Sequence, residues 1–349
     1  MQQKIVFSQV ETTVWGKWVV AFLSKLIRES SKPLRTARGA WSVRQGFIVC
    51  VEDESGVGYG EIAPIPEFGS ETLAAAEAFL WGLVADSELA DDVAALAALP
   101  CCAFGLSSAQ GQMLSNPASV GRRNYEVAAL LPAGAAGLRV LQAKLARGYE
   151  TFKWKVGVDF AEVEQSLFQK MMARLPTGAR LRLDANCGFS ITDLESWLWV
   201  LQRYADQVEY LEQPLTVGQE SLMAEYAESF GVPIALDESL NSAAGWQWLR
   251  EWRGPLVVKP ALMGDIAALV ERLRPVAERV VISSVFETAV GLENTLRIAD
   301  QLPDYKLAIG FDTLTAFADG LSPQKSAPII SAAERTGLTS ETIWKQLPI

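Results

Sequence analysis

The chain of 349 residues contains no histidine. This absence excludes three common kinds of site together: the Ser-His-Asp triad, the His-Asp dyad and any metal centre held by imidazole groups. A catalytic or metal site in this protein must therefore be built from carboxylate, lysine or backbone groups.

Cysteine is scarce, and its pattern carries no site. The four cysteines are Cys50, Cys101, Cys102 and Cys187, and their spacing matches neither a metal site nor the disulfide framework of a small secreted protein. A reducing cytoplasm is therefore the expected location.

Long apolar runs and basic clusters are also missing. The longest apolar stretch near the N-terminus, residues 18–27, is interrupted by Lys25 and falls well short of the roughly 20 residues that a membrane span needs. No basic segment with a cleavage site precedes it, so we expect no signal peptide. A net charge of −10 and a pI near 4.8 argue against nucleic acid or an anionic membrane as a partner. We expect a small-molecule ligand, and the sequence leaves open whether the protein is a monomer or a homo-oligomer.

What the sequence does contain is first an N-terminal α+β domain, which we assign to residues 1–120. Residues 46–64 form two strand-like runs joined by an acidic turn, which indicates a hairpin. The alanine-rich residues 70–99 predict a helix, with Ser70 and Glu71 suitable for its start. Residues 16–29 are apolar and helix-like, and residues 115–124 have the composition of a linker.

The remainder alternates between strands and helices. The predicted strands lie between residues 125 and 310 and are separated by seven helical crossovers, a pattern typical of a parallel barrel. We therefore predict an α/β fold, a (β/α)7β TIM-like barrel over residues 121–320 with the N-terminal domain as its cap. We expect the C-terminal tail, about residues 321–349, to return to the cap. The helical stretches carry five tryptophans that we expect to pack against the barrel wall, at positions 197, 199, 246, 248 and 252.

Five ionisable residues recur at nearly regular steps, each at the end of an apolar run. They are Lys155, Asp184, Glu212, Asp237 and Lys259, separated by 29, 28, 25 and 22 residues. One βα unit of a barrel takes roughly 31 residues, and the carboxyl ends of barrel strands share one rim. The sequence therefore predicts that three carboxylates flanked by lysines converge on this rim. Such a hard oxygen site favours Mg²⁺, with Mn²⁺ as a substitute.

Taken in order, these motifs resemble the enolase superfamily and, within it, the o-succinylbenzoate synthases. The resemblance covers nearly the whole length and includes the Lys-x-Lys of Lys153 and Lys155, followed by LDAN at 183–186, EQP at 212–214, DES at 237–239 and VKP at 258–260. GEIAP at 60–64, SSVFETAVGL at 283–292 and GFDTL at 310–314 favour the synthase branch. Dipeptide epimerases usually carry Asp-x-Asp near the eighth strand, whereas this chain has Asp312 without a second aspartate two residues on.

The resemblance implies roles that agree with the chemistry of the residues. Removing a proton next to a carboxylate builds two negative charges on one carboxyl group, which a multivalent cation and ammonium groups stabilise. Lys155 is then the base, its pKa lowered by Lys153 and the metal ion, and Lys259 stabilises the enediolate from across the barrel.

Several further residues are candidate contacts. Asn186 and Glu238 lie beside the metal ligands in sequence and are expected to orient them. Lys153, Arg182, Ser283 and Ser284 are candidate substrate contacts, because a dicarboxylate substrate needs cationic or N–H groups. Arg35 and Arg38 lie where the family has a mobile lid that closes over the substrate.

The expected activity is a Mg²⁺-dependent dehydration that converts 2-succinyl-6-hydroxy-2,4-cyclohexadiene-1-carboxylate to 2-succinylbenzoate, a step toward menaquinone or phylloquinone. An N-acylamino acid racemase or another cycloisomerase or epimerase of the same superfamily is the alternative. Two readings from other classes are an aldolase that forms a Schiff base on Lys155 or Lys259, and a barrel that binds a ligand without catalysis. The aldolase leaves the three carboxylates unexplained, and the paired lysines count against a barrel without catalysis.

Overall fold

The structure is a computed structural model of the whole chain. The residues that it describes are 9–15, 18–36, 39–86, 89, 92–114, 123–242, 244–322, 327–331 and 339–347. Side chains within residues 9–25 and 30–41 lie outside this description.

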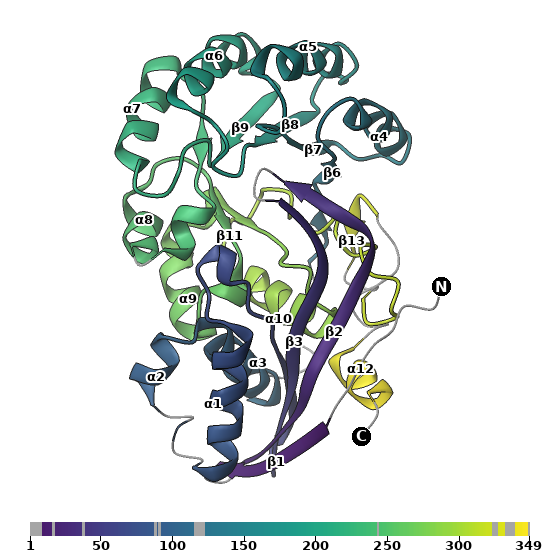
Figure 1. The fold of residues 1–349 in the computed structure, drawn as a ribbon, viewed down its shortest axis with the longest axis vertical. Helices are drawn as coiled ribbons and strands as arrows, with labels where there is room; N and C mark the ends of the chain where they lie inside the picture. Colours follow the sequence, from purple (N-terminus) through teal and green to yellow (C-terminus); the bar gives the residue numbers. More distant parts are fainter. Residues whose placement is uncertain are drawn as a thin grey trace.

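The N-terminal cap is built on an antiparallel sheet in the order β1-β2-β3-β4 (Figure 1). The strands are β1 (Gln9–Trp15), β2 (Trp18–Thr36), β3 (Gly39–Asp53) and β4 (Gly56–Ile62). The helices of the cap are α1 (Leu73–Ala85), α2 (Val93–Ala97) and α3 (Pro100–Leu114). Gly58 and Gly60 let β4 approach α3 closely, because a Cβ at either position would lie 1.8 Å from a carbonyl oxygen of that helix.

The hairpin predicted within residues 46–64 is confirmed, with β3 and β4 joined at residues 54 and 55. The single helix predicted over residues 70–99 is wrong in its bounds. It is split into α1 and α2, and the hydroxyl of Thr72, rather than Ser70 or Glu71, accepts the capping bond from Ala75. The linker predicted at residues 115–124 lies mostly outside the described residues.

Residues 18–29, the part of the segment at 16–29 that the structure describes, are not helical. They belong to β2, which pairs with β1 on one side and with β3 on the other. Pairing with β1 at residues 18–24 and with β3 at residues 19–23 and 26–29 supplies backbone hydrogen-bond partners along this apolar segment. Such tertiary context outweighs local helix propensity.

The barrel follows the cap and extends from the top of Figure 1 to its middle, where its last helices lie beside the cap. Its strands are β6 (Ala129–Leu131), β7 (Thr151–Lys155), β8 (Arg180–Asp184), β9 (Val208–Glu212), β10 (Ile234–Ala235), β11 (Leu256–Val258) and β12 (Val280–Ile282). The crossover helices are α4 (Ala136–Leu145), α5 (Ala161–Met172), α6 (Ile191–Leu201), α7 (Glu220–Phe230), α8 (Gly245–Glu251), α9 (Ile266–Leu273) and α10 (Ala289–Asp300). The short 3-10 turns include η1 (Pro66–Phe68), which belongs to the cap. Those of the barrel are η4 (Gln202–Tyr204), η5 (Glu238–Asn241), η6 (Pro260–Leu262) and η7 (Arg274–Arg279). The alternation of strand and helix confirms the (β/α)7β prediction.

The ring of strands closes through single backbone bridges. Leu236 bridges to Leu256, Ser283 to Gly310, and Ile309 to Val127, so the predicted eighth strand is reduced to its bridging residues. Beyond these bridges the carboxylate of Asp312 accepts the Leu130 N–H at 2.9 Å, in the place of a backbone carbonyl.

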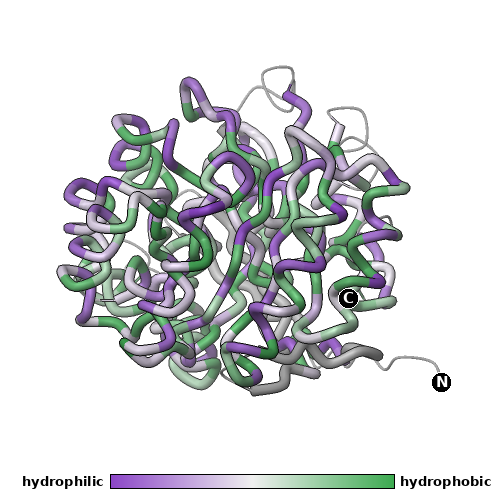
Figure 2. Tube along the Cα trace, turned by 90° about the horizontal axis from the view of Figure 1, so that it is seen from above, coloured by the Kyte–Doolittle hydropathy of each residue, from purple (hydrophilic) through white to green (hydrophobic). Residues whose placement is uncertain are grey.

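The tryptophan prediction is confirmed only in part. Trp197 and Trp252 are buried and Trp248 is partly buried against the same core, while Trp199 is 59% exposed and Trp246 39% exposed. The exposed pair lies on the outer helices and does not pack against the barrel wall. In the tube seen from above, many of the outer turns are hydrophilic (Figure 2).

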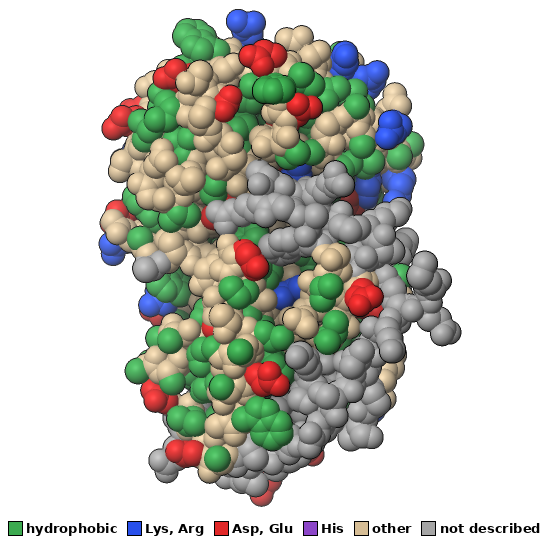
Figure 3. Space-filling view, viewed as in Figure 1, with side chains coloured by type: hydrophobic (Ala, Val, Ile, Leu, Met, Phe, Trp, Pro, Cys, Tyr) green, Lys and Arg blue, Asp and Glu red, His purple; other side chains and the backbone are tan. Residues whose placement is uncertain are grey.

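The chain ends beside the cap. The strands β5 (Tyr125–Glu126) and β13 (Ile329–Ile330) pair antiparallel. Helix α12 (Ser340–Gln346) then places Ile343 in a cluster with Ile48 and Tyr59 of the cap sheet. Within the described residues, no helix is both long and apolar enough to cross a membrane. On the face shown in Figure 3, acidic side chains are dispersed over both the barrel and the cap.

Candidate functional site

Three carboxylates lie at the carboxyl ends of three neighbouring barrel strands. Asp184 ends β8 and Glu212 ends β9, and the two are direct register partners. Glu212 is in turn the partner of Ala235 in β10, two residues before Asp237. All three side chains are at most 1% exposed. The parallel register thus brings to one place the carboxylates that the sequence spacing predicts.

Lysine ammonium groups contact each carboxylate. Lys155 Nζ lies 2.5 Å from Asp184 Oδ2, and Lys259 Nζ lies 2.5 Å from both oxygens of Asp237. Lys153 Nζ lies 2.6 Å from Glu212 Oε1 and 2.9 Å from Asp184 Oδ2. Because buried charges must be paired, these contacts balance the acidic groups within the protein.

The pKa values follow from burial and from these pairs. Burial and the charge of Asp184 raise the pKa of Glu212 to about 8, against the opposing effect of Lys153. Burial alone would raise the pKa of Asp184, but Lys153 and Lys155 outweigh it and hold that pKa well below its usual value. Burial likewise opposes the charge of Lys153, yet Asp184 and Glu212 raise its pKa. The pKa values in the cluster are therefore set by the balance between burial, which disfavours every charge, and the ion pairs, which favour them.

The donor set fits a hard divalent cation. Glu212 Oε2 is buried and has no hydrogen-bond partner among the described residues, and carboxylate oxygens are the ligands that Mg²⁺ prefers. In that part of the chain no three acidic or cysteine side chains stand in ready coordination geometry. Lysine ammonium groups contact oxygens of Asp184 and Asp237 that a metal ion would use.

Amide side chains hold the ends of these strands in place. Asn186, at φ 46°, donates its backbone N–H to Asp184 Oδ1 and accepts from Lys155 through Oδ1. Its Nδ2 donates to Glu238 Oε1 at 3.2 Å. Sequence reasoning missed the role of Gln213, a fully buried residue whose Oε1 accepts from the backbone of Asp237 at 3.0 Å. Its only signal was its place beside Glu212 in the EQP motif.

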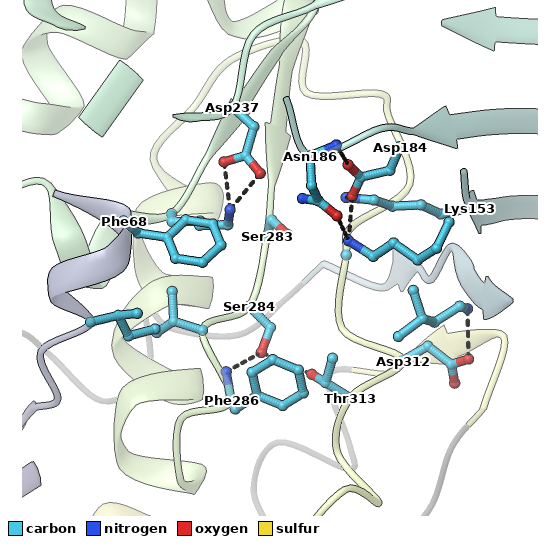
Figure 4. A pocket seen from close by; sticks show the side chains of 16 residues that line it. Phe68, Lys153, Asp184, Asn186, Asp237, Ser283, Ser284, Phe286, Asp312 and Thr313 are labelled. Carbon is cyan, nitrogen blue, oxygen red and sulfur yellow. Dashed lines mark hydrogen bonds and ion pairs between the residues drawn. The ribbon is translucent and has the colours of Figure 1, made fainter. Parts of the chain in front are cut away.

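A cavity opens beside the charged cluster (Figure 4), and the empty space within it, together with the solvent at its mouth, amounts to about 720 Å³. Its polar end includes Lys153, Lys155, Asp184, Asp237 and Lys259. Its other walls are largely apolar and are formed by Ile65, Phe68, Leu130, Val285 and Phe286. The cavity thus combines a charged end with a surface suited to a hydrocarbon ring.

The cap contributes to the cavity through η1. Phe68 places its ring 4.1 Å from Lys259 Nζ, a cation–π contact that sequence reasoning missed. No sequence signal marks this contact, because it joins residues of the two domains that are far apart along the chain.

The remaining predicted contacts differ in where they lie. Ser283 and Ser284 line the cavity, whereas Arg182 does not. Arg182 is 1% exposed inside the barrel, where it pairs with Glu209 and donates to the Ala308 carbonyl at 2.8 Å. The side chain of Arg35 and the whole of Arg38 lie outside the described residues.

Comparison with protein families divides the chain in the same way as the fold. The family model "Enolase C-terminal domain-like" matches residues 138–274, and "MenC, N-terminal domain" matches residues 29–113.

Similar sequences are o-succinylbenzoate synthases. That of Thermosynechococcus vestitus is 38% identical over 325 residues, which cover 90% of this chain and 95% of that protein. That of Yersinia pseudotuberculosis is 33% identical over 297 residues, covering 82% and 88%.

Comparison with solved structures agrees with the comparison of sequences. The o-succinylbenzoate synthase of Thermosynechococcus elongatus, a crystal structure with Mg in its active site, has a TM-score of 0.77 at 35% identity and covers 95% of this chain and 100% of its own. The L-Ala-D/L-Glu epimerase of Bacillus subtilis, at 20% identity, has a TM-score of 0.72 over 94% and 99% of the two chains and shows likeness of fold alone. From the match in sequence over nine-tenths of its length, the chain belongs to the o-succinylbenzoate synthase family of the enolase superfamily.

Proposed function

We propose that the chain is a Mg²⁺-dependent lyase that dehydrates 2-succinyl-6-hydroxy-2,4-cyclohexadiene-1-carboxylate to 2-succinylbenzoate in menaquinone or phylloquinone biosynthesis. The observation that carries the proposal is the set of three buried carboxylates at the ends of neighbouring strands, Asp184 and Glu212 in register and Asp237 just beyond β10. Lys155 lies on one side of this set and Lys259 on the other. Membership of the synthase family selects this substrate among the reactions that such a site supports.

The two lysines have separate roles. Lys155 takes the proton from the carbon next to the ring carboxylate, and the electron pair of that C–H bond moves into the carboxyl group. Lys259 stabilises the resulting negative charge from the opposite side. Lys155 then returns its proton to the departing hydroxyl, the C–O bond breaks, and water leaves as the ring becomes aromatic. One lysine therefore serves as both base and acid.

Asp184, Glu212 and Asp237 are the proposed ligands of the metal ion. A bound Mg²⁺, or Mn²⁺ in its place, would supply positive charge at the substrate carboxylate, where negative charge builds up during proton removal. Asn186 and Glu238 orient these ligands, and Lys153 contributes positive charge beneath them.

The cap is proposed to comprise residues 1–120, with the tail from about residue 321 returning to it, and the barrel residues 121–320. The contacts of α12 with the cap sheet support this division. A cytoplasmic location, and the absence of nucleic acid and membrane partners, remain our expectations from composition.

The deciding experiment is a comparison of kcat/KM on the hydroxycyclohexadiene, on N-acylamino acids and on dipeptides. We expect efficient dehydration, at most a side activity on N-acylamino acids and no measurable epimerisation of dipeptides. A dipeptide turned over faster than the hydroxycyclohexadiene would overturn the assignment and leave the fold unaffected.

A further inference from the structure

The loop between β12 and α10 forms one wall of the cavity and carries an unusual backbone conformation. Phe286 lines the cavity and has φ 63°, a left-handed conformation that residues with a side chain rarely adopt. Such conformations persist only where the surroundings enforce them, and they concentrate at functional sites. The fold must therefore contain groups that hold Phe286 in place.

The hydroxyl of Ser284 is one of these groups. It accepts the Phe286 N–H at 2.9 Å and a hydrogen bond from Thr313 Oγ1 at 2.8 Å, and it donates to Glu287 Oε2 at 2.5 Å. A hydroxyl has one donor and two acceptor positions, so all its capacity is used inside the protein. In contrast, Ser283 Oγ makes no hydrogen bond within the described residues and remains able to donate to a ligand.

Glu287 supports this arrangement from below the cavity wall. Its side chain is 4% exposed, and Oε2 accepts from the Val285 N–H at 2.8 Å as well as from Ser284. Oε1 has no hydrogen-bond partner in the described part of the chain. The contacts that this buried carboxylate makes there are thus with the loop that presents Phe286.

The cap holds the same loop from the other side. Arg44 Nε donates to the Val285 carbonyl at 2.9 Å, and Arg28 Nη1 donates to the Phe286 carbonyl at 2.8 Å. Phe317 contacts both groups: its ring centroid lies 4.4 Å from Arg28 Cζ and 6.3 Å from the centroid of the Phe286 ring. Figure 4 shows Ser284 and Phe286 at the end of the cavity away from Asp184 and Asp237.

We propose that Glu287 is a positioning residue: through Ser284 it holds Phe286 in the left-handed conformation, so that the Phe286 ring forms the wall against which the six-membered ring of the substrate packs. Phe286 is then the specificity-determining contact, and Ser283, not Ser284, is the hydroxyl that contacts the substrate. The inference rests on the proposed function, which supplies a ring-bearing substrate.

A double-mutant cycle tests the coupling. Phe286→Ala should raise KM for the hydroxycyclohexadiene about tenfold, equivalent to ~1.4 kcal/mol, while kcat changes much less. Glu287→Leu should raise KM by a similar factor because the ring is no longer held. The double variant should be no worse than Phe286→Ala, since Glu287 acts only through that ring. If the KM of the double variant instead rises by the product of the two single-variant increases, the proposal is wrong.

Conservative variants separate hydrogen bonding from charge and from folding. Glu287→Gln retains an acceptor for Ser284 and should keep KM near that of the wild type; an effect as large as that of Glu287→Leu would overturn the proposal. If Glu287→Leu does not fold, Ser284→Ala takes its place in the cycle, and any further loss in the Phe286→Ala background would show that Ser284 contacts the substrate directly.

Two controls complete the experiment. Glu71→Leu removes another buried carboxylate that accepts two backbone N–H groups, from Cys101 and Cys102, away from the cavity, and it should lower the melting temperature without changing KM. Phe286→Gly should melt higher than Phe286→Ala, because only glycine tolerates φ 63° without strain; equal melting temperatures would contradict the proposed restraint. A wild type that does not turn over the hydroxycyclohexadiene would instead refute the proposed function, which separates the two failures.

Discussion

Replacing Lys259 with methionine should destabilise the metal-free protein and make its stability strongly dependent on Mg²⁺. In the structure Lys259 Nζ contacts both oxygens of Asp237 at 2.5 Å, and the two residues are 8% and 1% exposed. Methionine keeps the apolar stem but leaves the Asp237 carboxylate buried without its cation. Breaking a buried ion pair from one side costs about 3–5 kcal/mol.

The assay is urea unfolding of the wild type and of Lys259→Met, each in excess EDTA and in saturating Mg²⁺. In EDTA we expect the variant to lose ~3 kcal/mol of unfolding free energy, the lower end of that range, because part of each side chain still reaches solvent. Mg²⁺ at about one hundred times its dissociation constant adds ~2.7 kcal/mol to any protein that binds it only when folded. The variant should gain more than the wild type, because its carboxylate has no competing ammonium group.

The matched control is Arg297→Met, which removes a cation from the partly exposed pair with Glu293, where the side chains are 19% and 20% exposed. Its loss should be at most about 1 kcal/mol, with no dependence on Mg²⁺. If Lys259→Met in EDTA is as stable as the wild type, the buried pair does not carry the energy that this reasoning assigns to it.

Three further predictions concern the metal ion, the base and pH. Asp184→Asn and Asp237→Asn should weaken Mg²⁺ binding in calorimetry without unfolding the protein, and EDTA should abolish turnover; full activity in excess EDTA would refute the metal site. Lys155→Ala should lose both turnover and exchange of the substrate α-proton with solvent, measured by NMR, and near-native turnover would place the base elsewhere. Burial, partly opposed by the hydrogen bond from Ser284, raises the pKa of Glu287 to about 7. Because the folded state then holds a proton that the unfolded state releases, stability should fall by about 3 kcal/mol as pH rises from about 4.5 to 7. Glu287→Gln should flatten this part of the stability profile, and an unchanged slope would contradict the assignment.

The barrel and its charged rim could be predicted from the sequence because both depend on local periodicity. Apolar runs ending in Lys155, Asp184 and Glu212 predict strand ends, and the parallel register of the strands then brings these three side chains together. The strand character of β2 could not be predicted in this way, since it depends on pairing with strands on both sides. The same holds for Arg182, whose strand position is correct while its side chain pairs with Glu209 inside the barrel.

Contacts between distant segments were the other limit. Phe68 reaches Lys259 from the cap, and Arg28 reaches the loop of Phe286. The spacing of residues along the chain predicts neither contact. Sequence reasoning thus located the polar end of the cavity and missed how the cap and the loop after β12 shape its apolar walls.

The pairing of each carboxylate with a lysine has a consequence for the order in which ligands bind. At a pH above the pKa of Glu212, about 8, Asp184, Glu212 and Asp237 carry three negative charges, equal in number to the three ammonium groups of the lysines described above. A divalent cation alone would leave this buried site with two excess positive charges, and a dicarboxylate alone with two excess negative charges. Entry of both restores neutrality, so each ligand should increase the affinity of the other by the same factor. Calorimetric titration of 2-succinylbenzoate with and without Mg²⁺ would measure that coupling as a single free energy.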